Sequence, residues 1–180
     1  MADPADQGHV FAKLIVLGLL VAQPVLASAK EYRNDAFGFR MTLPDSMNVC
    51  TTPVPAPDHG FLVIESGADC DDATRQPLME LFVEHNSLPL GNTPKEVAAK
   101  ACNGIARDTR WARGGAAIFE CEPAMRDGRA TQSYVLVQTA KRPDPEDWTI
   151  VVMSLFGKTP ASVPDRRHAR SLFARLRWTR

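Results

Sequence analysis

The chain has 180 residues, of which 44% are hydrophobic, and its 21 basic residues balance its 21 acidic residues. A near-neutral chain has no net field to draw it onto DNA, RNA or an anionic membrane, so nucleic-acid binding is disfavoured. Arginine outnumbers lysine by 15 to 6, and alanine and proline are frequent. GC-rich bacterial genes produce this bias, so we expect a bacterial source.

The first 29 residues have the pattern of a secretory signal peptide. Lys13 precedes an apolar run over residues 14–21, and Ala27 and Ala29 supply the small residues that a signal peptidase accepts at positions −3 and −1. The apolar stretch is about 13 residues long, whereas a membrane-spanning helix needs about 20. We therefore expect cleavage before Lys30 rather than a retained membrane anchor.

Cleavage divides the chain into a signal peptide, residues 1–29, and a mature domain, residues 30–180. The mature part has 151 residues, a normal length for a single domain. A domain of this size buries roughly 68–70% of the surface of its unfolded chain, enough for a core that does not depend on cross-links.

The first half of the mature chain has the alternating pattern of β-strands. Residues 37–43 place Phe37, Phe39, Met41 and Leu43 on one face, and this period of two predicts a half-buried strand that ends at Pro44. Further strands are expected at residues 47–50, 61–65 and 78–85, the last also compatible with a helix.

A helix is expected to begin at Thr93. The Thr93 side chain can accept a hydrogen bond from the backbone N–H three residues on, Pro94 suits the first helical position, and Glu96 can reach back to the cap. Gly104 marks the expected end. The apolar residues that share one face at helical spacing, and are expected to be buried, are Pro94, Val97, Ala98, Ala101 and Ile105.

Three more strands are expected at residues 116–121, 132–139 and 149–156, with turns at Asp127-Gly128 and residues 142–147 between them. Residues 150–153 are apolar on both faces, which predicts a central strand covered on both sides. A closing helix is expected over residues 164–178. Its buried stripe would be Ala169, Leu172, Phe173 and Leu176.

This order of elements predicts an α+β domain, a mainly antiparallel sheet with two principal helices packed on it. Together with Tyr32, the run Phe37-Gly-Phe39 and the pair Leu43-Pro44, it resembles the Mog1/PsbP-like group of α+β sandwiches, whose exported bacterial members begin with a similar strand. The resemblance implies this fold and a tendency toward binding roles. It brings no catalytic residues to this chain.

All four cysteines, Cys50, Cys70, Cys102 and Cys121, follow the export signal. An even number of cysteines in an exported chain predicts disulfides in an oxidising compartment. Four cysteines allow three pairings. We favour Cys50–Cys70 with Cys102–Cys121, because each bond closes a loop of about 20 residues, worth roughly 3 kcal/mol. The other two pairings remain open.

No metal ion or cofactor is expected. The cysteines form no Cys-x-x-Cys pair and have no histidine three to five residues away, which disfavours zinc. Asp69, Asp71 and Asp72, with Glu65 upstream, could supply oxygen ligands to calcium. Their spacing differs from that of calcium-binding loops, so a solvated loop is the favoured interpretation.

The proline-rich loop over residues 51–60 is the candidate binding surface. Pro53, Pro55 and Pro57 stiffen it, and Asp58 and His59 form a turn near its end. A stiff loop beside a disulfide loses little entropy when it engages a protein partner in the cell envelope. The alternative is a plain rigid connection.

Arginines on the last predicted helix form a second candidate surface. Arg166, Arg170 and Arg177 lie on one stripe, with Arg167 and Arg175 flanking it. They could dock an acidic partner, although a solvated helix face is the favoured interpretation.

The sequence contains no nucleophile elbow, zinc-protease motif, phosphate-binding loop or dinucleotide-binding motif. We therefore expect a periplasmic or secreted, disulfide-bonded, non-enzymatic domain that binds a protein. An inhibitor or immunity protein against an envelope-targeted toxin is one alternative. A small envelope hydrolase using His59 or the loop over residues 69–72 is another, and a structural envelope component is a third.

Overall fold

The computed structural model describes residues 29–51, 59–65, 68–71, 76–87, 90–111, 114–139, 144–158 and 162–179. The expected signal peptide lies outside these residues except for Ala29, so the cleavage site stays a prediction. The strands are β1 (Ala29–Asn34), β2 (Phe39–Pro44), β3 (Met47–Cys50), β4 (Gly60–Glu65), β5 (Met79–His85), β6 (Ala106–Asp108), β7 (Ala116–Cys121), β8 (Ala124–Arg126), β9 (Arg129–Gln138), β10 (Thr149–Phe156) and β11 (Leu176–Trp178). The helices are α1 (Pro94–Ala101), the short 3-10 helix η1 (Pro145–Asp147) and α2 (Arg166–Phe173).

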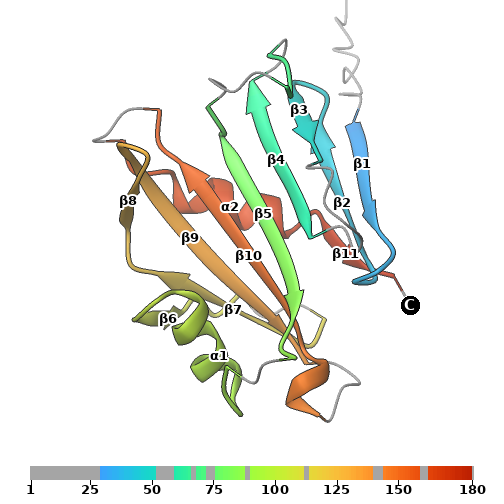
Figure 1. Ribbon diagram of the computed structural model, residues 1–180, viewed down its shortest axis with the longest axis vertical. Helices are drawn as coiled ribbons and strands as arrows, with labels where there is room; N and C mark the ends of the chain where they lie inside the picture. Colours follow the sequence, from blue (N-terminus) through green and yellow to red (C-terminus); the bar gives the residue numbers. More distant parts are fainter. Residues whose placement is uncertain are drawn as a thin grey trace, which may run out of the picture.

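The strands form two antiparallel sheets (Figure 1). The large sheet has the order β3-β4-β5-β10-β9-β7-β6, and β8 also pairs with β9. The small sheet has the order β1-β2-β11. β10 lies at the centre of the large sheet, where Val151 pairs with Val83 of β5 and with Leu136 of β9.

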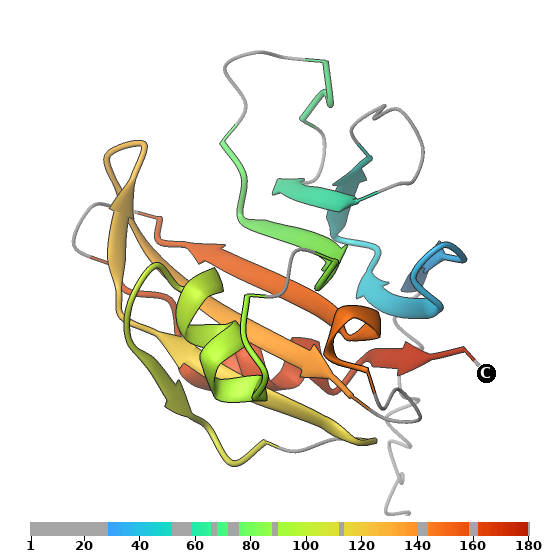
Figure 2. The same ribbon diagram turned by 60° about the horizontal axis from the view of Figure 1, so that its bottom comes forward.

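The main core lies between the small sheet with α2 and one face of the large sheet. Phe39 and Met41 of the small sheet, Leu172 of α2 and Met153 of β10 all belong to this cluster and are at most 2% exposed. In Figures 1 and 2, α2 crosses behind the large sheet and the small sheet stands beside it. The alternation of β2, apolar inward and polar outward, is what places its inner face against this core.

The second core cluster covers part of the opposite face of the large sheet. Val97 and Ala98 of α1 pack with Val135 and Val137 of β9 and with Ile150 of β10. Figure 2 shows α1 in front of these strands. Ile150 belongs to this cluster while Val151 and Met153 belong to the main core. The prediction that residues 150–153 are covered on both faces is therefore confirmed at these three residues, whereas Val152 is only partly buried.

The start of α1 is as expected, and its end is not. The Thr93 side chain accepts from the backbone N–H of Glu96, and the Glu96 carboxylate accepts from that of Thr93, which completes a capping box. The helix ends at Ala101, and Asn103 turns the chain with φ of 55°. Ile105 therefore leaves the helical face and is 55% exposed, so the prediction of its burial is wrong.

The closing helix is shorter than expected. α2 ends at Phe173, and Leu176–Trp178 forms β11, which pairs with β2. The apolar stripe nevertheless predicted burial correctly at Leu176, which is only 3% exposed although it lies in a strand and not in the helix. The expected helix through Trp178 is wrong because pairing with the edge of β2 satisfies the backbone of these residues better than a further helical turn.

The fold class is confirmed: the domain is α+β, with antiparallel sheets and the α-helices α1 and α2 packed on the large one. Neither of these helices has the length and apolar content to cross a bilayer, and the same holds for every helix in the part of the chain that the structure describes.

Candidate binding surface

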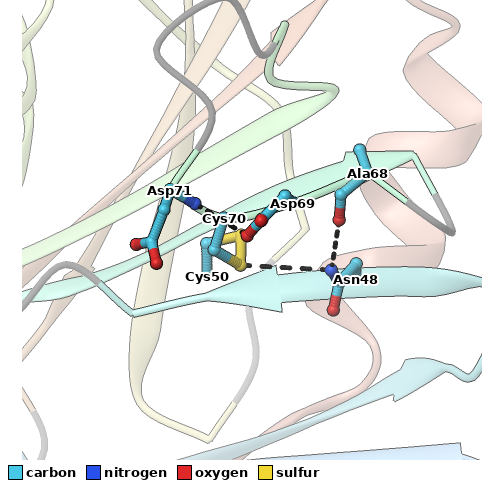
Figure 3. The surroundings of a disulfide bond; sticks show 6 residues. All are labelled: Asn48, Cys50, Ala68, Asp69, Cys70 and Asp71. Atoms are coloured by element: carbon cyan, nitrogen blue, oxygen red, sulfur yellow. Dashed lines mark hydrogen bonds between the residues drawn. A yellow bond between two sulfur atoms is a disulfide. The ribbon is translucent and has the colours of Figure 1, made fainter.

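The disulfide Cys50–Cys70 joins the end of β3 to the segment that follows β4. Its Cα atoms are 5.5 Å apart. Figure 3 shows the surrounding contacts: the side-chain amide of Asn48 donates to the carbonyl oxygen of Ala68 at 2.9 Å, and the backbone N–H of Asp71 donates to the Asp69 carboxylate at 3.1 Å. The bond therefore fixes one end of the proline-rich segment and the loop after β4 to the same sheet edge.

The disulfide Cys102–Cys121 joins the C-terminal cap of α1 to the last residue of β7, with Cα atoms 5.3 Å apart. It holds α1 against the sheet face that the helix covers. The structure thus contains the pairing that the sequence favoured, and no cysteine remains free among the described residues.

His59 is held at the start of β4 by its ring. Nδ1 lies 2.9 Å from the carbonyl oxygen of Val83, and since a carbonyl can only accept, Nδ1 carries the hydrogen and donates it. The ring stacks on Phe82 at a centroid distance of 5.6 Å and an interplanar angle of 14°. The centroid of the Phe37 ring also lies 5.6 Å from that of His59, with the two ring planes tilted by 52°. The histidine is therefore fixed in one orientation beside two aromatic rings.

Gly60 allows His59 to reach this position. Its φ of +131° is one that L side chains rarely adopt, and a Cβ atom built there would lie 1.9 Å from the carbonyl oxygen of Leu81. β4 and β5 thus approach closely at Gly60, which pairs with Phe82.

Phe82 is the exposed centre of this region. Phe82 is 40% exposed. Val152 of β10, which pairs with Phe82, is partly buried against the second core cluster. A shallow hollow of about 160 Å³ lies alongside, lined in part by His59, Leu62 and Phe82. We call the group His59, Leu62, Phe82 and Val152 the Phe82 patch.

The rim of the Phe82 patch is charged. Glu80 lines the hollow and forms an ion pair with Arg126, which comes from the β8–β9 hairpin. Glu80 also pairs with Leu62 across the ladder, and Leu62 pairs with Cys50. Since directly paired residues project to the same face of a sheet, the Cys50–Cys70 disulfide stands on the face that carries Phe82.

The sequence-derived binding loop is placed only in part. His59 belongs to the Phe82 patch, whereas Pro53, Pro55, Pro57 and Asp58 lie outside the described residues. Phe82 itself was missed as a site residue. Its signal was present in the sequence, because strand alternation in residues 78–85 puts a phenylalanine between Glu80 and Glu84 on the face opposite Leu81 and Val83.

The other candidates from the sequence are dispersed. Asp69 and Asp71 share a hydrogen bond in the loop after β4, and Asp72 lies outside the described residues. Within those residues, no three histidine, cysteine or acidic side chains form a group that could hold a metal ion.

The expected arginine stripe is divided between two elements. Arg166 of α2 pairs with Glu120 at 3.3 Å and lies over the Trp111 ring, whereas Arg177 belongs to β11. A single helical stripe through Arg166, Arg170 and Arg177 is therefore wrong, because the helix ends before Arg177.

No protein-family model and no curated protein matches the chain. Among solved structures, it is similar to the Ran-binding protein Mog1p of Saccharomyces cerevisiae, with a TM-score of 0.51 and 11% identity over 84% of this chain and 96% of that chain. A Mog1 variant gives a TM-score of 0.50 at 11% identity over the same shares of the two chains. The PsbP protein of Synechocystis aligns over 89% of this chain and 98% of its own, with 10% identity and a TM-score of 0.40. The likeness is one of fold, and the chain has the Mog1/PsbP-like fold that its opening strand had indicated.

Proposed function

We propose that the mature domain is an exported protein-binding module and that the Phe82 patch is its contact surface. The observation that carries the proposal is the 40% exposure of Phe82 on a sheet face, with the His59 ring stacked on it. Aromatic side chains at the centre of a patch, with charged groups at its rim, are the usual anatomy of a protein interface.

The rigidity of the surroundings supports this use. The Cys50–Cys70 bond, the Nδ1 hydrogen bond of His59 and the close approach at Gly60 hold the patch in one arrangement before any partner arrives. A surface that is already ordered loses less conformational entropy on binding, so more of the contact energy appears as affinity.

Two further observations support the proposal indirectly. A chain whose cysteines are all cross-linked fits an oxidising compartment. Mog1p, which shares the fold, is described as a Ran-binding protein. It therefore offers a precedent for protein binding on this scaffold without indicating the partner.

A site-specific photocrosslinker tests the contact surface. Replacing Phe82 by a photoreactive phenylalanine in the cells that make the protein should give a discrete cross-linked partner. The same replacement at Ile105, which is 55% exposed and precedes β6 at the other edge of the large sheet, is the matched control and should not. The identity of the partner would also show whether the module is an inhibitor of a toxin.

Affinity for the partner found in this way gives a second measurement. Phe82→Ala should weaken binding about tenfold or more, because truncating a central aromatic residue commonly costs over 1 kcal/mol. Ile105→Ala should leave it unchanged. Equal cross-linking from both positions, or an affinity unaffected by Phe82→Ala, would contradict the proposal.

A further inference from the structure

We propose that a second hollow, where β4 and β10 end and β9 begins, binds a ligand through a carboxylate group. Figure 1 draws these strand ends uppermost. The volume of the hollow is about 360 Å³, within the range of small-ligand sites. The polar and charged residues that line it are Glu65, Gln76, Arg129 and Lys158. We call it the Arg129 pocket. It shares no lining residue with the Phe82 patch, so the two proposals stand separately.

Arg129 is the central residue of this pocket because it is a buried cation without a counter-ion. The residue is 8% exposed. Its Nε donates to the carbonyl oxygen of Gly157 at 2.8 Å, its Nη1 donates to that of Pro77 at 2.8 Å, and the guanidinium lies over the Phe156 ring. Within the described part of the chain, no carboxylate oxygen comes within 4.0 Å of the guanidinium.

The two carbonyl groups satisfy hydrogen bonds but do not neutralise the charge. Removing a guanidinium from water is costly unless a negative charge accompanies it. The neighbouring Arg126 shows the contrast: it lies on the same hairpin, is more exposed and is paired with Glu80. The buried Arg129 thus faces a cavity and lacks a carboxylate partner, whereas the more exposed Arg126 is paired with a carboxylate of the protein.

Lys158 and Glu65 narrow the class of anion. Lys158 adds a second positive charge at the pocket and Glu65 adds one negative charge, which leaves a net charge of +1 with Arg129. A group with one negative charge would neutralise this net charge of +1, whereas the second negative charge of a phosphate would be repelled by the Glu65 carboxylate. The planar carboxylate is also the geometric match for a guanidinium. The carboxylate could belong to a small free acid or to the C-terminus of a polypeptide.

Titrations with defined probes test the pocket in the intact mature protein. The probes are sodium acetate, N-acetyl-trialanine with a free C-terminal carboxylate, the same peptide as its C-terminal amide, and inorganic phosphate. Binding is measured through the NMR signal of the Arg129 Nε–H. We expect saturable binding of a carboxylate probe and no binding of the amide. Saturation by acetate with no stronger binding of the peptide indicates a small free acid, and tighter binding of the peptide indicates a polypeptide C-terminus.

Variants that avoid the buried residue keep the test independent of folding. Lys158→Met should weaken carboxylate binding about tenfold through loss of one charge-assisted contact. Glu65→Gln should tighten it several-fold, because a repelling charge is removed. Lys95→Met, which removes an exposed lysine on α1, is the control and should change nothing. The proposal is overturned by equal binding of acid and amide, by phosphate binding more tightly than carboxylate, by the absence of saturation, or by responses of Lys158→Met and Glu65→Gln that match the control.

Discussion

Gly60 is the residue on which the geometry of the Phe82 patch most depends. It combines a backbone angle suited to glycine with a contact too close for any side chain. In the main core, the ring of Tyr134 is fully buried and contacts the rings of Trp111 and Phe173, and its hydroxyl donates to Glu120 at 3.5 Å. Both residues make testable contributions to the free energy of unfolding.

Gly60→Ala should lower the free energy of unfolding by more than about 3 kcal/mol, because it adds backbone strain to a collision with the Leu81 carbonyl. Gly128→Ala is the matched control. Gly128 also has a positive φ, of +72°, but open space surrounds its Cβ position, so strain alone should cost about 1–2 kcal/mol. Denaturant unfolding of the two variants measures the difference, and equal losses would show that the close approach at Gly60 is unimportant.

Tyr134 predicts a loss of stability in alkali. Burial, and then the negative charge of Glu120, raise the pKa of the Tyr134 hydroxyl above its ordinary value. Above about pH 10 the unfolded chain therefore releases this proton while the folded protein keeps it, so the free energy of unfolding falls as pH rises. Below about pH 10, the tyrosine is protonated in both states and its full contribution to the free energy of unfolding is retained.

Tyr134→Phe isolates this effect, since the ring contacts remain and the titrating hydroxyl is removed. Denaturant unfolding at a series of pH values from about 8 to 11 should show a shallower decline for the variant than for the unmodified protein. Parallel curves would mean that Tyr134 ionises as readily in the folded protein as in the unfolded chain.

At the scale of elements, the sequence was informative where periodicity extended over enough residues. The bounds of β3, β7 and β10 coincide with the expected strands, and the capping box of α1 lies at Thr93 as its residues indicated. β6, β8 and β11 have three residues each, too few to show a period, and they form because neighbouring strands supply hydrogen-bond partners. β1 escaped prediction because Tyr32 stands between Lys30 and Asn34 on its inward face, so the strand shows no apolar alternation.

The Cys102–Cys121 bond should contribute about 3 kcal/mol to the free energy of unfolding, because it closes a loop of 19 residues. Replacing both cysteines by alanine should also weaken hydrogen-exchange protection in α1 more than in β10, since the bond holds the helix cap to β7. The Cys50–Cys70 bond closes a loop of 20 residues, so replacing both of these cysteines by alanine is the matched control. This control should leave the hydrogen-exchange protection of α1 unchanged. Unchanged protection of α1 without the bond Cys102–Cys121 would contradict its role.

At the scale of the whole molecule, the sites were harder to infer than the fold. The fold follows from strand alternation, two amphipathic helices and the favoured cysteine pairing, which are local patterns. The Phe82 patch joins His59 to Phe82 across two strands, and the Arg129 pocket gathers the ends of β4, β9 and β10. Such groupings depend on register between distant segments, which a single sequence does not contain.

We propose that the chain is exported, loses its signal peptide and forms both disulfides before it acts. Intact-mass measurement of the protein isolated from its native cells without reductant tests this most directly. We expect a chain that begins at Lys30 and gains the mass of four hydrogens on reduction, as two disulfides require. A mass that retains residues 1–29 and does not change on reduction would contradict it.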